Sequence, residues 1–349
     1  MMNELIPVDR ARALVETLFL KAGMGAEKVK PVTAILLEGE LLGHQTHGLH
    51  LVMPYMEHLK KGSMQAKGAI EIINHTSTSE LWNGQYLPGP WLVKSAIDRA
   101  KQMAHVGGTG TIVIQQCSHI GCLAAYMEEA TRDGSMIILA CSDPDNKTVA
   151  PFGGTTGVYS PNPLALGIPT ESEPIIIDVS MSATSNGLIH QKKANGERLE
   201  HPWLMTAEGY ATDDPATFFD TPPATILPLG GLDSGYKGFA LGIMIEALTS
   251  ALGGHGRVKE PGRWGASTFL QVINPNTFAG ESYFKKEMEH LKNNCLKSRA
   301  ADTSNPVRMP GQRGLERKQK QLQDGLDLRK DTLEGLQKLA SDYGLSLIN

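Results

Sequence analysis

Three histidines fall within seven residues near the N-terminus, at His44, His47 and His50. Imidazole is the side chain whose free pKa lies closest to neutrality, so a rigidly held histidine can give or take a proton at cellular pH. Most histidines are not catalytic, and His44 and His50 are interpreted as helix-surface or satisfied core residues. The segment Thr46-His47-Gly48 is the most suggestive part of the stretch, which makes His47 the candidate for acid–base chemistry.

A second candidate histidine follows a predicted buried strand over residues 111–114. In an α/β layer, ligands usually bind where a strand ends and the next helix begins, which is where His119 stands. A metal site made by Cys117, His119 and Cys122 is an alternative. It is disfavoured because tetrahedral zinc needs a fourth ligand and this spacing matches no common zinc module.

Other segments could hold a polar or phosphorylated ligand. Small polar side chains stand at predicted strand ends in 159–165 and 177–182, and Lys237 lies between glycines ahead of an apolar helical pattern. A lysine beside backbone amides at a helix start suits a diphosphate, although a solvated lysine that caps a turn is the alternative. Residues 107–110 are glycine-rich, but they follow a helix and precede a strand, the reverse of the order in a Rossmann site.

The elements that must position these residues change in character along the chain. Apolar stripes predict helices over 8–22, through Val29 to Leu36, and over 55–62, so a packed helix delivers the histidine stretch. A hairpin of 69–74 with 79–82 follows, and helices then alternate with strands. This alternation is typical of an α/β layer with helices packed on a sheet.

The second half of the chain is less regular. Residues 151–235 are rich in Pro, Gly, Asp and Thr, with one predicted strand at 175–178, and are expected to wrap the surface or line a cleft. An apolar stripe over 241–252 predicts a helix buried on most sides. A strand at 269–274, a helix through about Cys295 and a final helix from Asp331 complete the pattern.

Composition excludes several classes of protein. The 349 residues are 41% hydrophobic and carry 33 basic against 37 acidic side chains, so neither nucleic acid nor an anionic membrane is an expected partner. The four cysteines show no framework spacing, which suits a reducing cytosol. No leader pattern or membrane-length apolar run is present, and a cytoplasmic location is expected.

The order and spacing of these landmarks resemble the malate/L-lactate dehydrogenase family that lacks the Rossmann fold. The resemblance implies an α/β (mixed α+β) fold with a helical domain and a mixed-sheet cofactor domain. Residues 1–70 together with 255–349 would form the first, and 71–254 the second, in a homodimer. The matching segments are Thr46-His47-Gly48, His119, Pro151-Phe152-Gly153-Gly154, Asn162-Pro163-Leu164-Ala165, Asp178-Val179-Ser180, Asp214-Pro215, Tyr236-Lys237-Gly238, Ile273-Asn274-Pro275 and Pro310-Gly311.

The resemblance also implies the chemistry. Hydride would pass from a nicotinamide cofactor to a 2-oxo or 2-imino carbon while His47 supplies the proton and His119 orients the substrate. A positioned imidazolium neutralises and protonates the developing oxyanion, an effect typically worth about 10²–10⁴ in rate. No metal is implied. The positions carried over are, for the cofactor, Pro174, Ile177, Asp178, Ser180, Tyr236, Lys237, Gly311, Gln312 and Arg313, and, for the substrate, Thr46, Leu51, Asn162 and Leu188.

Departures from the family pattern shape the substrate prediction. Leu51 stands where many members carry an arginine that grips a carboxylate, and Leu188 stands where lysine or aspartate is common. Ser160-Pro161 replaces the usual Gly-Thr, and proline removes a backbone N–H there. We therefore predict a bulkier or more apolar 2-oxo acid, or a cyclic imine, in preference to malate.

The cofactor and the competing functions complete the predictions. Gln312-Arg313 stands where an acidic residue would accept the ribose hydroxyls of NAD, so NADPH is predicted over NADH. One alternative is a catalytically silent family member that acts as a binding or scaffold protein. Metal-dependent hydrolysis through the clustered histidines is the least favoured hypothesis.

Overall fold

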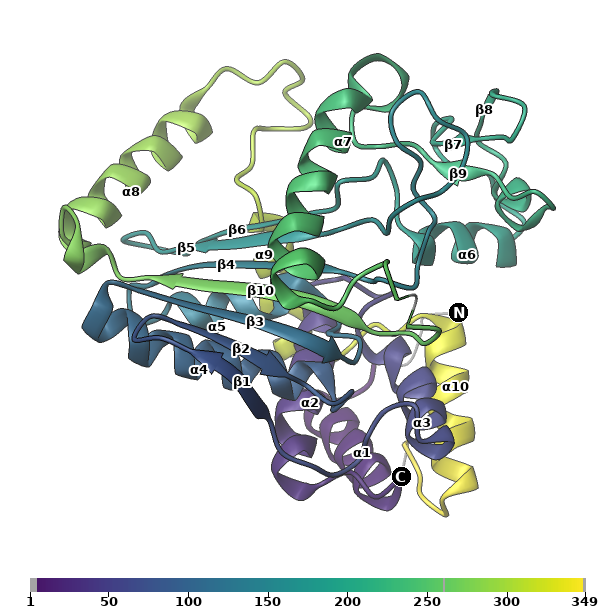
Figure 1. The fold of residues 1–349 in the computed structure, drawn as a ribbon, viewed down its shortest axis with the longest axis horizontal. Coiled ribbons are helices and arrows are strands. Elements are labelled where there is room, and N and C mark those ends of the chain that lie inside the picture. The colour runs from purple at the N-terminus through teal and green to yellow at the C-terminus, as the bar shows by residue number, and fades with distance from the viewer. Residues whose placement is uncertain (1–4, 260, 348–349) are drawn as a thin grey trace.

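The computed structural model describes residues 5–259 and 261–347. Its centre is a seven-stranded sheet in the order β1-β2-β3-β10-β4-β5-β6, and three short strands form a second sheet in the order β8-β7-β9 (Figure 1). In the large sheet β2 pairs with β3 in parallel and the other neighbours pair antiparallel, so the predicted mixed α/β fold is confirmed. The strands are β1 Glu71–His75, β2 Ser79–Asn83, β3 Thr109–Cys117, β4 Met136–Ser142, β5 Leu164–Ile168, β6 Ile175–Val179, β7 Leu204–Met205, β8 Ala211–Thr212, β9 Thr225–Ile226 and β10 Ala266–Ile273.

Helices flank the large sheet and cap one end of it (Figure 1). The predicted helices over 8–22 and 55–62 are confirmed as α1 and α3. No helix in the described ranges combines the length and apolarity needed to cross a bilayer. The helices are α1 Val8–Lys21, α2 Ala26–Leu41, α3 Val52–Lys61, α4 Gly89–Gly107, α5 Met127–Thr131, α6 Asn186–Ala194, α7 Gly231–Glu246, α8 Glu281–Lys297, α9 Gln312–Asp324 and α10 Lys330–Asp342, with short turns η1 Leu49–Leu51, η2 Leu123–Tyr126, η3 Pro215–Phe219, η4 Ala247–Ala251 and η5 Pro275–Thr277.

The middle of the large sheet is buried on both faces. Ile112 and Ile114 of β3 belong to the core under α4, whereas Val113 between them packs with Ile245 of α7 on the other face. Because side chains alternate across a strand, a strand covered on both faces reads as a continuous apolar run. This is why 111–114 could be predicted as a buried strand.

The helices at one end share a second core. Leu18 of α1, Leu36 of α2, Tyr55 of α3 and Leu336 of α10 are all buried in it. Ile35, the neighbour of Leu36, belongs instead to the core of the large sheet. Helix α2 is therefore clamped between two cores, and the chain leaves it in a fixed direction at the histidine stretch.

The division into two domains stays a prediction. Strand β10 comes from 255–349, the part predicted to be helical, yet it lies between β3 and β4 at the centre of the sheet. Helices α9 and α10 of the same part pack against α2 and α3.

The region predicted to be irregular, 151–235, contains more structure than expected. Strand β5, helix α6 and the three-stranded sheet were missed. The inner positions of β5 are Ala165 and Gly167, and a Cβ atom on Gly167 would lie 2.7 Å from Thr131 Cγ2. Because α5 packs so closely on this strand, its inner positions are small and lack the usual strand signal.

The prediction that the apolar helix over 241–252 is buried on most sides is wrong. Helix α7 begins at Gly231 and contains Lys237, and Leu241, Ile243 and Met244 are exposed on it. Its packed side is made largely of glycines, and a Cβ atom on Gly238 would lie 2.4 Å from the Leu229 nitrogen. An apolar residue pattern identified the helix, but it did not show which side other parts of the chain cover.

Candidate active site

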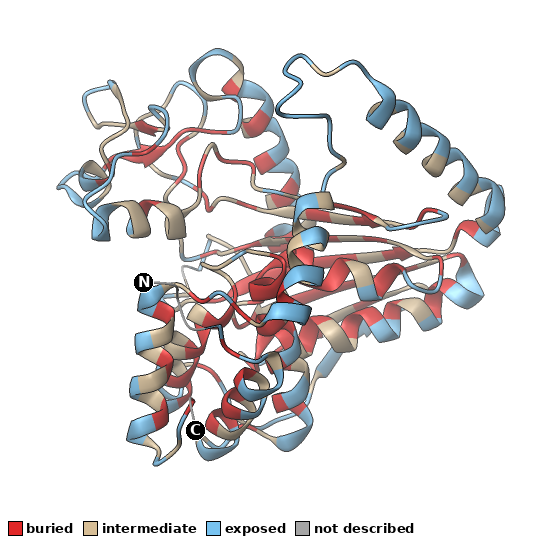
Figure 2. Cartoon of the chain, turned by 180° about the vertical axis from the view of Figure 1, so that it is seen from behind, coloured by how far each residue is buried: buried red, intermediate tan, exposed pale blue. Residues whose placement is uncertain are grey.

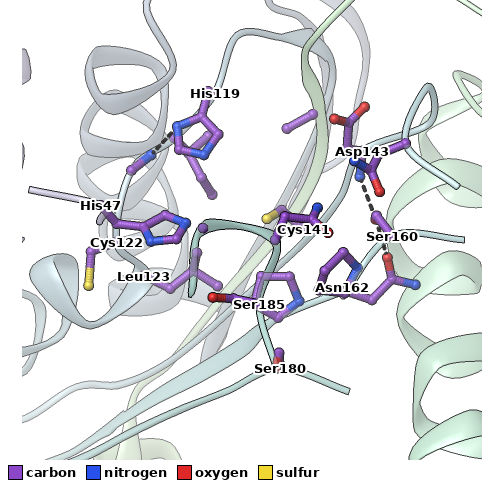
Figure 3. A pocket seen from close by; sticks show the side chains of 18 of the residues that line it. His47, His119, Cys122, Leu123, Cys141, Asp143, Ser160, Asn162, Ser180 and Ser185 are labelled. Carbon is purple, nitrogen blue, oxygen red and sulfur yellow. Dashed lines mark hydrogen bonds between the residues drawn. The ribbon is translucent and has the colours of Figure 1, made fainter. Parts of the chain in front are cut away.

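One cavity in the structure has a volume of about 360 Å³. It lies where the end of α2, the ends of β3 and β4, and the start of α6 come together. Segments around His47, His119, Asp143, Asn162 and Trp264 supply most of its wall. Figure 3 shows His47 and His119 on one side of this cavity, with Asp143, Ser160 and Asn162 on the opposite side.

His47 follows directly from the packed end of α2. Its Nδ1 lies 3.0 Å from the hydroxyl oxygen of Thr46, which also lines the cavity. Burial, with smaller contributions from His44 and His50, lowers the pKa of His47 to about 4. The ring is therefore neutral at pH 7 and can accept a proton.

His119 is held in one tautomer by its surroundings. The Gly121 N–H donates to His119 Nδ1 over 3.2 Å, so the proton of the neutral ring belongs on Nε2. The Tyr55 hydroxyl lies 3.1 Å from the same nitrogen and donates to the His119 carbonyl over 2.7 Å. Burial, with smaller contributions from His47 and His58, lowers the pKa of His119 to about 3, so this ring is a neutral hydrogen-bond donor.

An aromatic stack makes this wall rigid. The ring centroids of His47 and His119 are 5.8 Å apart, and those of His119 and Trp264 are 4.5 Å apart, with interplanar angles of 26° in both pairs. Trp264 was not predicted as a site residue. It lies in an irregular segment ahead of β10, where no periodic pattern marks it.

The opposite wall is a hydrogen-bonded polar network. Ser160 Oγ accepts the Asp143 N–H over 2.9 Å and donates to Asn162 Oδ1 over 2.5 Å. Asn162 Nδ2 donates to the Gly242 carbonyl and to Glu246 Oε1, which fixes this buried amide from behind. These bonds place predicted residue Asn162 at the cavity with little freedom to move.

Asp143 is a cavity residue that the sequence reading missed. Burial raises its pKa to about 6, against the opposing hydrogen bonds from the backbone N–H groups of Asp145 and Asn146. A signal was available, because the apolar run over 136–141 indicates a strand that ends just before Asp143, as another strand ends before His119.

A second cavity of about 320 Å³ continues from the first, because His44 and Asp178 line both. Asp178 Oδ2 accepts the Ala124 N–H over 2.8 Å and lies 3.7 Å from Cys122 Sγ, and burial raises its pKa. The second cavity contains predicted residues Gly311 and Arg313.

Positive charge gathers in this second cavity. Arg308 and Arg317 line it together with Arg313. A third cavity, of about 310 Å³, shares Met309 with the second and contains predicted residues Pro174 and Gln312. The three cavities are therefore neighbours in a series that extends away from the histidine wall.

Five predicted residues lie outside the three cavities described. Leu51 is 7% exposed and packs into the helical core, because η1 turns it inward. Leu188 lies in the first turn of α6, where its N–H donates to Ser185 Oγ, and Ile177 lies on β6 next to Asp178. Tyr236 and Lys237 are on the exposed side of α7, so their predicted cofactor contacts, like the roles of the other site residues, stay predictions.

The metal site considered from the sequence does not form in the described residues. The one group there with metal-ligand geometry is His44, Cys122 and Asp178, whose ligand atoms lie within 4.8 Å of one another. Cys117 is instead buried in the core of the large sheet, because it is the last residue of β3. In the group of His44, Cys122 and Asp178, the Asp178 carboxylate already accepts the Ala124 N–H.

Known proteins match both the sequence and the fold. The family model for malate/L-lactate dehydrogenase matches residues 6–337. The malate/(S)-sulfolactate dehydrogenase of Methanothermus fervidus is 27% identical, over 98% of this chain and 99% of its own. Malate dehydrogenase from Entamoeba histolytica has the same fold, with a TM-score of 0.93 at 24% identity over 99% of both chains.

A further solved structure is Δ1-piperideine-2-carboxylate reductase from Pseudomonas syringae pv. tomato, with a TM-score of 0.84 and 22% identity over 97% of this chain and 100% of its own. The fold and the sequence match thus define a dehydrogenase built on a mixed sheet rather than on a Rossmann domain. The chain belongs to the malate/L-lactate dehydrogenase family, as the resemblance implied.

Proposed function

We propose that the chain reduces a 2-oxo acid or a cyclic 2-imino acid with NAD(P)H, and catalyses the reverse oxidation, with His47 as the proton-transfer group. The main support for this proposal is the wall in which the His47 and His119 rings stand 5.8 Å apart, at one end of a series of neighbouring cavities. A nicotinamide cofactor, when bound, would supply or receive the hydride.

His47 suits both directions of proton transfer. With a pKa of about 4, it is neutral at pH 7 and can accept the hydroxyl proton of an alcohol substrate. An anionic substrate beside the ring favours the imidazolium and raises this pKa, which prepares His47 to donate in the reduction. His119 would donate through Nε2–H to the same substrate oxygen and orient it, because its Nδ1 already accepts a hydrogen bond.

The donors in the second and third cavities suit a dinucleotide. Arg313 and Arg317 line the second cavity and form no carboxylate ion pair within the described ranges, so their guanidinium groups can meet a phosphate. This supports NADPH over NADH. The proposed cofactor contacts remain Pro174, Ile177, Asp178, Ser180, Tyr236, Lys237, Gly311, Gln312 and Arg313.

The charge of the first cavity supports the substrate proposal. No lysine or arginine lines it among the described residues, and Leu51 is turned into the core. A substrate with one carboxylate, such as an apolar 2-oxo acid or a cyclic imino acid, fits this wall better than a small dicarboxylate does. Thr46 and Asn162 would hold its polar end.

The exposed apolar surface supports a homodimer. Tyr236 and Ile243 on α7 are 52% and 51% exposed, and no residue of α8 is buried (Figure 2). Apolar surface of this kind marks an interaction site, and a second copy is the occupant implied by the family. The free cysteines support a cytoplasmic location.

The experiment is a substrate panel with cofactor binding measured in parallel. The parent chain is tested with NADPH and NADH against oxaloacetate, pyruvate, bulkier 2-oxo acids and cyclic imino acids. We expect the highest kcat/KM with NADPH and a bulky or cyclic substrate. Best turnover of oxaloacetate would contradict the substrate proposal, and binding without any turnover would favour the catalytically silent alternative. Loss of activity on chelation would favour metal chemistry.

A further inference from the structure

Glu40 lies in the last turn of α2, directly beneath the backbone that carries His47. We propose that Glu40 is a positioning residue, which holds the His47 loop in its productive place through the amide of Leu49. This inference rests on the proposed role of His47.

The contacts between α2 and the loop are unusually close. Glu40 Oε2 accepts the Leu49 N–H over 3.0 Å. A Cβ atom on Gly48 would lie 2.5 Å from this oxygen and 2.8 Å from the Glu40 nitrogen, so only glycine allows the loop to lie so near the helix. Gly39 allows the same approach from the helix side, where a Cβ atom would lie 3.0 Å from the His47 carbonyl oxygen.

His47 has no carboxylate partner within hydrogen-bond distance in the described chain. Its Nδ1 contacts only the neighbouring Thr46 hydroxyl, which belongs to the same loop. The orientation of the imidazole therefore depends on where the backbone of 46–49 is held. Glu40 is the side chain outside the loop that hydrogen-bonds this backbone.

Packing alone does not account for a carboxyl group at this position. Glu40 is 1% exposed, and its Oε1 is buried without a hydrogen-bond partner among the described residues. A buried acceptor with no donor is unfavourable for folding, so hydrogen bonding within the described chain does not explain this oxygen. Oε1 thus carries a folding penalty, whereas Oε2 holds the loop through the Leu49 N–H.

The ionisation of Glu40 falls near neutrality. Burial raises its pKa to about 7, against the opposing effects of the Leu49 N–H, Arg317 of α9, Arg329 ahead of α10 and Gln45 in the loop. His47 and His50 lie on the same loop, and Asp331 of α10 acts on His50. An ionised carboxylate binds the Leu49 amide more strongly than a neutral carboxyl does, so within the folded chain this hydrogen bond is strongest above pH 7.

The test compares Glu40→Gln with Glu38→Gln in the oxidation direction. Glu38 lies on the same helix but pairs with Lys318, so it is a matched control. We expect Glu40→Gln to lower kcat by about tenfold to a hundredfold, with an unchanged Kd for NADPH. The parent should lose activity as the pH falls through 7, and this acid limb should be absent in Glu40→Gln and present in Glu38→Gln.

Stability separates positioning from a purely structural role. Because the pKa of Glu40 is raised in the folded chain, its carboxyl contributes stability that is lost as the pH rises through 7. Glu40→Gln should therefore melt at pH 8 no lower than the parent while kcat falls. A lower Tm with an unchanged pH profile would overturn the proposal, as would a kcat and pH profile equal to those of the parent.

A measurement on the unaltered chain covers the case in which Glu40→Gln fails to fold. Hydrogen exchange of a peptide spanning 46–52 is followed from pH 6 to pH 8 and corrected for the intrinsic rate. Because an opening that permits exchange also exposes Glu40 to water, protection should fall as the pH rises through 7, and constant protection would overturn the proposal. If His47→Gln keeps the parent rate, the proposed function itself fails, whereas an inactive His47→Gln with a normal Glu40→Gln overturns only the positioning role.

Discussion

The helical end of the molecule and the face of α7 carry similar apolar stripes but differ in how they are covered. Leu36 of α2 is fully buried and Tyr55 of α3 is enclosed by the same core, which also holds the base of the His47 loop. On α7, Leu241 and Met244 belong to an apolar stripe of the same period but stand exposed.

This difference shows that an apolar stripe can be covered by its own chain or left exposed by it. The helical end is closed by its own chain, since α10 returns from the C-terminus to pack beside α3 (Figure 1). The described chain leaves the face of α7 exposed, and we propose that a second copy covers it. Variants in the two regions should therefore affect chemistry and folding in the first, and assembly in the second.

The largest effect is expected at His47. His47→Gln keeps a polar side chain of similar size but cannot transfer the proton, so kcat should fall by about 10²–10⁴. NADPH binding and the oligomeric state should not change. His50→Gln, in the same stretch but outside the cavity, is the control and should keep the parent kcat within about twofold. Equal losses in both variants would mean that the loop, and not the imidazole of His47, is responsible.

Matched truncations of apolar residues compare the two regions directly. Leu36→Ala leaves a cavity between packed helices and should lower the free energy of unfolding by about 2–5 kcal/mol. Ile243→Ala removes an exposed side chain and should change the unfolding of the dissociated chain by less than about 0.5 kcal/mol. Urea unfolding at low protein concentration measures both. Similar changes in the free energy of unfolding for the two variants would show that the two regions do not differ in how they are covered.

The proposed interface is tested by a charge on α7. Ile243→Asp would bury an unpaired carboxylate at a dimer contact, so the dimer dissociation constant should rise at least about tenfold. Sedimentation equilibrium measures this constant, and Val106→Asp, at an exposed residue at the end of α4, serves as the control. If Ile243→Asp has the same dissociation constant as the parent, the dimer forms through another surface or the chain does not form a dimer.

The smallest effect is expected in the second cavity, away from His47. Arg313→Gln removes one guanidinium group from the second cavity, so the Kd for NADPH should rise about tenfold while the Kd for NADH stays close to that of the parent. Fluorescence titration with both cofactors measures the two constants. An equal change for both would show that Arg313 does not contact a 2′-phosphate.

Local patterns predicted the parts of the fold that local physics determines. The strand ahead of His119 has apolar residues on both faces, and the α2 stripe leads directly to His47, so both histidines could be placed at element ends. Residues brought in by distant packing could not be found in this way. Trp264 stacks on His119 from an irregular segment, and Arg317 reaches the second cavity from α9.

Other features were hidden because tertiary contacts override local preference. Gly167 of β5 is small because α5 lies against it, which removed the strand signal there. Asp143 differs from these, because it follows a predicted strand and could have been found by the rule that was applied to His119. The family resemblance supplied roles for residues, and the geometry supports those at the cavity more directly than it supports Tyr236 and Lys237.

A crystal structure of the chain with NADP⁺ and an unreactive substrate analogue tests the central claim most directly. The account predicts that an imidazole nitrogen of His47 lies within about 2.6–3.2 Å of the analogue's hydroxyl or carbonyl oxygen, with the nicotinamide ring in the same cavity. A nicotinamide ring bound away from the wall of His47 and His119 would contradict it.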